Sequence, residues 1–270
     1  MGIFDNVLLL SDFDGTLTGS SGCLVQRNLD AVRYFIAEGG RFSVSTGRTK
    51  IGFHKYSPEY INAPVILGNG AMAFDYEKGE AVFVNAITEK NIPVLNRIIA
   101  DNPWICMELY SVDDTAYVIN INPASKRHFE NLGIDSYRAI TELTSEMFPM
   151  VKIMLSAGER SEEIQNYLRS IPLGEMKFIP CAGSFVEILA QSAGKGNALY
   201  QTADYLLIDR KNAFAVGDGS NDVDMIETAS VGFVPSSGDR IALNIADVIV
   251  CSSDEGAVAD VVYYLADKFN

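Results

Sequence analysis

Two aspartates near the start of the chain follow a short apolar run, Val7 to Leu10. Asp12 and Asp14 lie two positions apart at the end of a predicted buried strand, so their side chains can point to one side of the backbone. Like charges held this close are costly unless a cation lies between them or they have different roles in one reaction. Gly15 permits a sharp turn where backbone amides can meet an anion. These residues indicate metal-assisted phosphoryl transfer.

Three further segments carry polar side chains suited to the same chemistry. A second apolar run ends in Ser45-Thr46-Gly47-Arg48, a later one ends in 217–222 (Gly-Asp-Gly-Ser-Asn-Asp), and a predicted helix begins at Lys195. In an open parallel sheet, the residues that follow the strands share one crevice. Together the segments supply a carboxylate nucleophile, a second carboxyl for proton transfer, an acidic metal site, a hydroxyl and an ammonium group.

Strand and helix patterns alternate in both terminal parts of the chain. Strands are predicted at 42–45, 65–67, 213–216 and 248–250, and a helix with one apolar stripe is predicted at 28–38, ended by two glycines. Strands that alternate with helices favour a parallel sheet with helices on both faces. The predicted fold class is therefore α/β, with a Rossmann-like parallel-sheet core.

The pattern changes near residue 85. Two strand-like runs, 104–110 and 115–121, are joined by a polar turn and predict an antiparallel hairpin. Further strands are predicted at 151–155, 177–180 and 185–189. We expect an α+β domain over about 85–183, inserted into a core made of residues 1–84 and 184–270.

In order and spacing, the four polar segments resemble the motifs of the haloacid dehalogenase-like (HAD) phosphatases. The large insert between the second and third motifs resembles the Cof-type branch, in which an inserted cap closes over the substrate. The chain departs from this branch at 19–23 (Gly-Ser-Ser-Gly-Cys), where the family usually has a polar and basic linker. It also has Val234-Pro235-Ser236-Ser237 where many members have a Gly-Asn-Ala turn. Both departures weaken inference about the substrate and leave the chemistry untouched.

The resemblance implies roles for the acidic residues. Asp12 would attack phosphorus and become an aspartyl phosphate, while Asp14 would protonate the leaving alcohol and then deprotonate water. Mg²⁺ would be held by the Asp12 carboxylate, the Asp14 backbone carbonyl and Asp218. Asp222 would be a ligand or lie just beyond the ligands. Oxygen ligands of this kind suit Mg²⁺ better than zinc.

The resemblance also implies which residues bind the phosphoryl group and the rest of the substrate. Thr46, Gly47, Lys195 and Asn221 would hold the phosphoryl oxygens. Arg48 and Asn69 are candidates for contact with the substrate. A surface ion pair is the alternative for Arg48, and a left-handed turn is an equal alternative for Asn69, which lies between two glycines.

Structural interpretations compete with the functional ones at several of these positions. Asp218 and Asp222 could cap a helix, but Ser220 is also a suitable cap, which favours metal binding for the aspartates. A calcium loop starting at Asp218 is excluded because its sixth position is Val223 rather than glycine. A P-loop around Lys195 is excluded because no Ser or Thr follows the lysine.

Composition limits the possible partners and location. The chain of 270 residues has a net charge of −14 and no cluster of basic residues, which argues against nucleic-acid binding. No run approaches the roughly 20 apolar residues needed to span a bilayer. Four separate cysteines predict reduced thiols and a cytoplasmic protein. The sequence does not indicate an oligomeric state.

The leading hypothesis is an Mg²⁺-dependent phosphatase that hydrolyses a small phosphorylated metabolite, such as a sugar phosphate. A phosphosugar mutase is the alternative among enzymes. A phospho-accepting signalling module is the alternative from another class, since receiver domains also use clustered aspartates, a hydroxyl and a lysine. Such a module explains neither the large insert nor the spacing of Asp12 and Asp14.

Overall fold

The computed structural model describes residues 2–181 and 185–270, which form two compact units. The first unit contains the chain up to Gly47, residues 55–83 and residues 194–270; the second contains residues 48–54 and 84–193. The second unit therefore runs past the predicted limit at residue 183. It does so because β11 (Phe185–Ala190) pairs with both β10 (Met176–Pro180) and β9 (Met150–Ser156).

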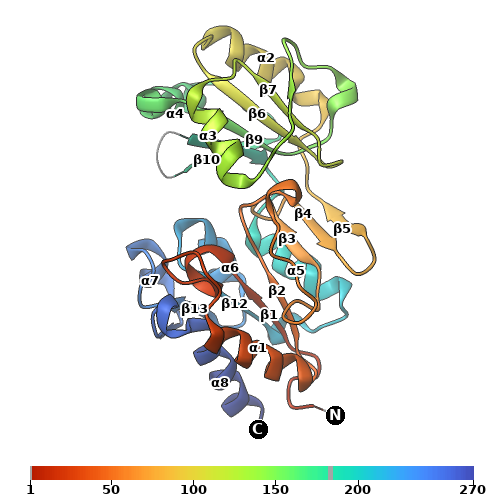
Figure 1. Ribbon diagram of the computed structural model, residues 1–270, viewed down its shortest axis with the longest axis vertical. Coiled ribbons are helices and arrows are strands. Elements are labelled where there is room, and N and C mark those ends of the chain that lie inside the picture. The colour runs from red at the N-terminus through yellow and green to blue at the C-terminus, as the bar shows by residue number, and fades with distance from the viewer. Residues whose placement is uncertain (1, 182–184) are drawn as a thin grey trace. The chain divides into compact units, whose positions relative to one another are not determined.

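A parallel sheet forms the centre of the first unit (Figure 1). Its strand order is β14-β13-β12-β1-β2, with every neighbouring pair parallel. The strands are β1 (Leu8–Ser11), β2 (Arg41–Val44), β12 (Ala213–Val216), β13 (Gly232–Pro235) and β14 (Val248–Val250). Because β1 lies between β2 and β12, the loops that follow these three strands leave the same edge of the sheet.

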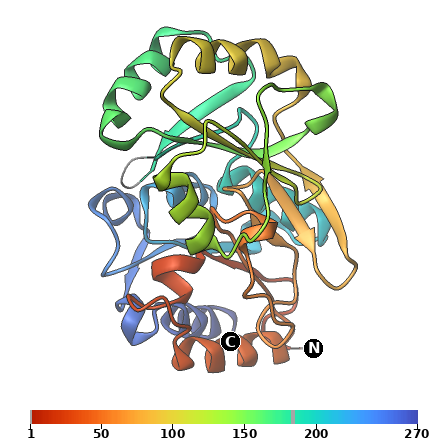
Figure 2. The same ribbon diagram turned by 45° about the horizontal axis from the view of Figure 1, so that its top comes forward.

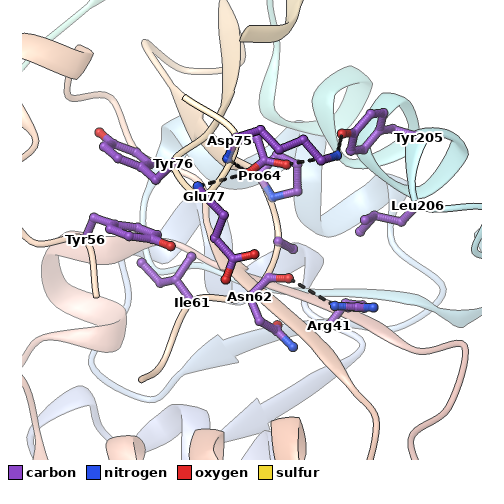
Figure 3. Close-up of a pocket in the computed structure, with 12 residues that line it drawn as sticks. Arg41, Tyr56, Ile61, Asn62, Pro64, Asp75, Tyr76, Glu77, Tyr205 and Leu206 are labelled. Carbon is purple, nitrogen blue, oxygen red and sulfur yellow. Dashed lines mark hydrogen bonds and ion pairs between the residues drawn. The ribbon is translucent and has the colours of Figure 1, made fainter. Parts of the chain in front are cut away.

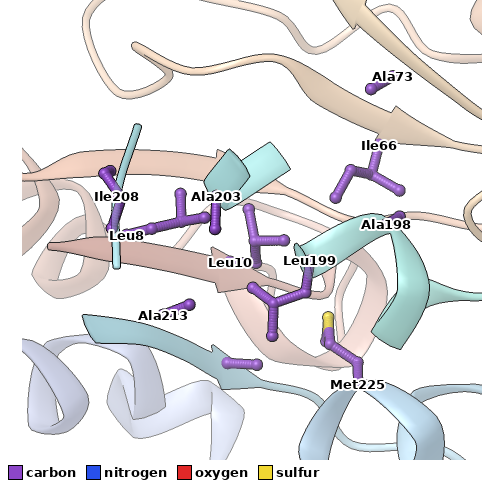
Figure 4. Packing of buried hydrophobic residues seen from close by; sticks show 11 residues of the cluster. Leu8, Leu10, Ile66, Ala73, Ala198, Leu199, Ala203, Ile208, Ala213 and Met225 are labelled. Atoms are coloured by element: carbon purple, nitrogen blue, oxygen red, sulfur yellow. The ribbon is translucent and has the colours of Figure 1, made fainter. Parts of the chain in front are cut away.

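Helices cover both faces of this sheet, as the sequence predicted. Leu8 and Leu10 of β1 pack with residues of α5 (Lys195–Tyr205) and α6 (Val223–Thr228) on one face (Figure 4). On the other face, the ring centroid of Phe214 lies 5.9 Å from that of Phe269 in α8 (Ala257–Phe269). There α8 packs against α1 (Gln26–Ala37). The first unit also contains α7 (Arg240–Ile245). The predicted α/β class is confirmed.

A second, smaller sheet contains β3 (Val65–Leu67), β4 (Met72–Asp75) and β5 (Glu80–Val84). The strand predicted at 65–67 is therefore present, but it pairs antiparallel with β4. A parallel bridge between Ser45 and Ile66 joins β3 to the residue that directly follows β2. The turn at 68–70 reverses the chain, with positive φ at Gly68, Asn69 and Gly70, so that β3 and β4 form a hairpin.

The second unit is built on a six-stranded sheet in the order β10-β11-β9-β6-β7-β8. The predicted hairpin is formed by β6 (Cys106–Ser111) and β7 (Ala116–Ile119), and β7 also pairs in parallel with β8 (Arg138–Ala139). Helices α2 (Ile92–Asp101) and α4 (Ser161–Ser170) cover one face, and α3 (Pro123–Leu132) lies on the other (Figures 1 and 2). Within the described residues, no helix has both the length and the apolar character needed to cross a membrane.

Candidate active site

The turn that follows β1 fixes the position of Asp12. The backbone N–H of Asp12 still donates to the Val216 carbonyl of β12, at 2.8 Å. The chain then makes a tight turn in which Gly15 has a φ of +84°. The Thr18 hydroxyl donates to the Phe13 carbonyl at 3.0 Å and accepts from the Gly15 amide at 3.2 Å, which closes the turn.

The two aspartates of this turn occupy different environments. The Asp12 residue is only 5% exposed, whereas Asp14 is exposed. The alternation expected of a strand does not continue to Asp14, because β1 ends at Ser11 and the turn begins directly after Asp12. Two carboxyls with different access to water can perform different tasks in one reaction.

Lys195 joins two of the sequence motifs. It is the first residue of α5 and is buried, and its Nζ lies 2.5 Å from Oδ1 of Asp12 and 2.5 Å from Oδ1 of Asp222. Burial raises the pKa of Asp12 well above its usual value, and the Lys195 ammonium opposes this shift only in part. Burial lowers the pKa of Lys195, but the two carboxylates outweigh it and the net shift is upward. The ammonium is therefore held in its charged form.

Asp222 organises the turn that follows β12. Its Oδ2 accepts from the amides of Asp218, at 3.1 Å, and Gly219, at 3.0 Å, while its Oδ1 accepts from Lys195. The sequence proposed Ser220 as the cap of this segment; that was wrong, because the cap interactions come from Asp222 and Ser220 is exposed. Both oxygens of Asp222 thus have partners within the protein.

Asp218 faces the turn after β1. Its Oδ1 accepts from the Thr16 hydroxyl at 2.8 Å, and a Cβ built on Gly15 would lie 2.6 Å from its Oδ2, so only glycine permits this approach. Burial raises the pKa of Asp218, and the Thr16 hydrogen bond opposes that effect. Sequence reasoning gave Thr16 no role of its own. Its place in the first motif, directly after Gly15, was the only available signal.

The acidic residues fit a hard divalent cation. One carboxylate oxygen from each of Asp12, Asp218 and Asp222 lies within 4.8 Å of the other two. Carboxylate oxygens are the ligands that Mg²⁺ prefers in proteins. Since both oxygens of Asp222 already accept hydrogen bonds, Asp12 and Asp218 are the better placed ligands and Asp222 supports them. The predicted contribution of the Asp14 carbonyl stays a prediction.

The residues predicted to bind phosphate lie in adjoining loops. Thr46 is buried, its N–H donates to the Ile66 carbonyl at 2.9 Å, and its carbonyl accepts from the Asn69 N–H at 3.0 Å. The Asn221 side chain donates to Oδ1 of Asn69 at 3.4 Å. The structure thus brings together Thr46, Asn69 and Asn221, which the sequence separates by up to 175 positions. Arg48, by contrast, belongs to the second unit, and its contact with substrate stays a prediction.

The first unit also contains a cavity of about 210 Å³, whose lining residues are drawn in Figure 3. Arg41, at the beginning of β2, lines it, whereas Thr46 follows the other end of that strand. Tyr56, Tyr76 and Tyr205 also line it, and none of the predicted site residues does. The candidate active site is therefore the group of loops around Asp12 and Lys195.

Comparison with known proteins adds independent information. Residues 9–262 match the model of the haloacid dehalogenase-like hydrolase family. An uncharacterized hydrolase of Schizosaccharomyces pombe is 30% identical, over 98% of this chain and 94% of that protein. The phosphatase YwpJ of Bacillus subtilis is 26% identical, over 96% and 99% of the two chains. A solved HAD subclass IIB sugar phosphatase shares the fold with a TM-score of 0.83 and 19% identity, over 96% and 99% of the chains.

Proposed function

Because the chain belongs to the haloacid dehalogenase-like hydrolase family, we propose that it is an Mg²⁺-dependent phosphatase acting on a small phosphorylated metabolite. This is the family that the four motifs resemble. The observation that carries the proposal is the arrangement of Lys195, whose buried ammonium lies between Asp12 and Asp222. A cation so placed supports a carboxylate nucleophile and can also attract phosphoryl oxygens.

We assign the covalent steps to the two aspartates of the first motif. An Asp12 carboxylate oxygen attacks phosphorus, the bond from phosphorus to the ester oxygen breaks, and Asp14 protonates the departing alcohol. Asp14 then takes a proton from water as that water attacks phosphorus, which releases inorganic phosphate and restores the Asp12 carboxylate. The exposure of Asp14 supports this role because its carboxyl can exchange protons with water.

The remaining residues bind and orient the phosphoryl group. Mg²⁺, when bound by Asp12 and Asp218, would supply positive charge that offsets the charge of the substrate. The Thr46 hydroxyl, the Gly47 amide and the Asn221 carboxamide would donate to phosphoryl oxygens, and the Lys195 ammonium would add a charge-assisted hydrogen bond. Without these cations, the acidic cluster would repel an anionic substrate.

A sugar phosphate is the substrate class that we propose, supported by the shared fold with a sugar phosphatase. A cytoplasmic location is proposed on the basis of the four cysteines, all of which are free. Arg48 is the candidate for contact with the sugar.

The test measures phosphate release from p-nitrophenyl phosphate and from a panel of phosphorylated metabolites, with Mg²⁺ and with EDTA. We expect release that stops with EDTA, returns with Mg²⁺ and is absent in Asp12→Asn. Substrate loss without equal phosphate release would instead indicate a mutase. A long-lived phosphorylated Asp12 without turnover would indicate a signalling module. Full activity in metal-free protein would refute the metal assignment.

A further inference from the structure

The turn at residues 68–70 contacts two of the loops to which phosphate binding is assigned. The Asn69 N–H donates to the Thr46 carbonyl at 3.0 Å, and Oδ1 of Asn69 accepts from Nδ2 of Asn221 at 3.4 Å. A Cβ built on Gly47 would lie 3.2 Å from both Nδ2 and Oδ1 of Asn69. The Asn69 carboxamide therefore lies between the Thr46–Gly47 loop and Asn221.

The same turn also contacts the residue before Lys195. A Cβ built on Gly70 would lie 2.1 Å from the carbonyl oxygen of Gly194, which immediately precedes α5. Gly70 has a φ of +90° and Asn69 a φ of +53°, in the left-handed region that glycine and asparagine tolerate best. The turn thus approaches the start of the lysine-bearing helix closely, in a conformation that few residues adopt.

Burial distinguishes Asn69 from an ordinary turn asparagine. The residue is only 7% exposed, whereas Asn6, which has a φ of +63°, is exposed. A buried carboxamide held between two polar loops restricts the orientations that both loops can adopt. Phosphate donors must be held close to their productive geometry, because small displacements weaken charge-assisted hydrogen bonds.

We propose that Asn69 is a positioning residue, which acts on the phosphoryl group through Asn221 and the Thr46–Gly47 loop rather than by binding the substrate itself. This inference rests on the proposed phosphatase function. Loss of the carboxamide would leave the backbone turn in place but free the Asn221 side chain to turn away. Phosphate would then meet donors that are less well oriented.

Asn69→Gly tests the proposal because glycine retains the left-handed turn and removes only the carboxamide. Asn6→Gly makes the same chemical change at an exposed left-handed position and serves as the matched control. With p-nitrophenyl phosphate, we expect kcat/KM to fall roughly tenfold in Asn69→Gly. The inhibition constant of inorganic phosphate should rise by a similar factor. The thermal unfolding midpoint should stay within the range of the control variant.

A double-mutant cycle with Asn221→Ala separates positioning from direct contact. If Asn69 acts in part through Asn221, the loss of activity in the double variant should be smaller than the product of the two single losses. Fully additive losses would mean that Asn69 does not act through Asn221 and would overturn the proposal. Unchanged kinetics of Asn69→Gly beside an active wild-type protein would also overturn it. Absence of phosphate release by the wild-type protein would instead overturn the proposed function itself.

Discussion

Each unit buries a cluster of charged side chains, and the two clusters are built in different ways. In the first unit, Asp12, Lys195 and Asp222 come from loops or from the start of a helix at one edge of a parallel sheet. In the second unit, Glu108, Lys152 and Glu187 lie within three neighbouring antiparallel strands, β6, β9 and β11. The first, which we call the loop cluster (Asp12, Lys195 and Asp222, with Asp218 beside them), therefore depends on turns. The second, the strand cluster (Glu108, Lys152 and Glu187), depends on strand register.

The register of the second sheet places its charges on a single face. Glu108 of β6 and Glu187 of β11 both pair with Met154 of β9, so the two carboxylates flank this residue. Lys152 Nζ lies 2.9 Å from Oε1 of Glu187. The Oε2 atom of Glu108 accepts from the Tyr110 hydroxyl at 2.7 Å and lies 2.6 Å from Nδ1 of His128.

The two clusters are both buried, but they differ in their ratio of carboxylates to cations. The Lys195 ammonium pairs with Asp12 and Asp222, and Asp218 adds a third carboxylate nearby. Among residues 2–181 and 185–270, these three aspartates are the one set of acidic or metal-ligating side chains close enough to hold an ion. Burial is the main cause that raises the pKa of Asp12, and the nearby carboxylates of Asp222 and Asp218 raise it further. The strand cluster pairs each carboxylate with a neighbouring donor. The loop cluster is thus suited to a cation and an anionic substrate, the strand cluster to structural pairing.

The largest expected effect comes from removing Asp12, the proposed nucleophile of the loop cluster. Asp12→Asn retains the shape of the side chain but cannot form an aspartyl phosphate, so phosphate release should fall by several orders of magnitude. The fold should persist, because asparagine has the same size and Lys195 keeps its ion pair with Asp222. Phosphate release and a thermal unfolding curve, measured on the same preparation, check both expectations. Retained activity would rule out Asp12 as the nucleophile.

The two buried lysines provide a matched pair. Lys195→Met should lower phosphate release from p-nitrophenyl phosphate by about 10²–10³-fold, the typical cost of losing a donor to a developing charge. Lys152→Met should leave most of that activity. Lys195→Met leaves two buried carboxylates without their ammonium partner, and Lys152→Met leaves one. Each should therefore lower the free energy of unfolding by about 3–5 kcal/mol.

Kinetic assays and denaturant titrations of both variants decide whether the comparison holds. Equal losses of activity in Lys152→Met and Lys195→Met would show that the strand cluster also takes part in the reaction. An unchanged free energy of unfolding in Lys152→Met would show that the Lys152–Glu187 pair contributes little to stability.

A smaller effect is expected from the second carboxylate of the strand cluster. Glu108→Ala removes the partner of the half-buried His128 and the acceptor of the Tyr110 hydroxyl, which leaves a buried donor without its acceptor. Such a loss typically costs about 1–3 kcal/mol. Hydrogen exchange should accelerate in β6 and β9 and stay unchanged in β1 and β12. Faster exchange in β1 as well would mean that the two units unfold together.

The loop cluster could be predicted from sequence because its residues follow apolar runs within short, glycine-containing motifs. Asp12, Lys195 and Asp218 were all identified in this way, and so was the α/β class that brings their loops to one edge. Thr16 received no role, because its hydrogen bond to Asp218 joins residues 202 positions apart. The cap residue was misassigned to Ser220, since a serine and an aspartate in one short turn are equally suitable caps.

The strand cluster could not be predicted for a physical reason. Glu108, Lys152 and Glu187 are isolated charges in apolar strands, and alternation alone does not say which face of a sheet is buried. The β9–β6 and β11–β9 register that brings them together depends on pairing across more than 30 residues. In the first unit, β13 and the β4–β5 strands were not predicted either. The turn at 68–70 was recognised as such, but its contacts with Gly47 and Asn221 required the structure.

The smallest expected effect concerns a thiol on the same face of the strand cluster. Burial raises the pKa of Cys106 to about 11, and a hydrogen bond with Ser125 opposes that shift only partly. An unfolded thiol has a pKa of about 8.5, so the folded chain holds this proton to higher pH. Its contribution to stability is therefore intact below about pH 8.5 and declines as the pH rises toward 11.

Alkylation with iodoacetamide, followed by mass spectrometry of peptides, measures this difference directly. The exposed Cys23 should react at pH 9, whereas Cys106, with no exposed surface, should react only when the second unit opens. Between pH 8.5 and 11, Cys106→Ala should lose less stability than the wild-type protein, and Cys23→Ala should follow the wild-type curve. Equal alkylation of the two thiols in folded protein would mean that water reaches the charged face of this sheet. The partners of Glu108 and Glu187 within the protein would then not be the only groups that stabilise these two buried carboxylates.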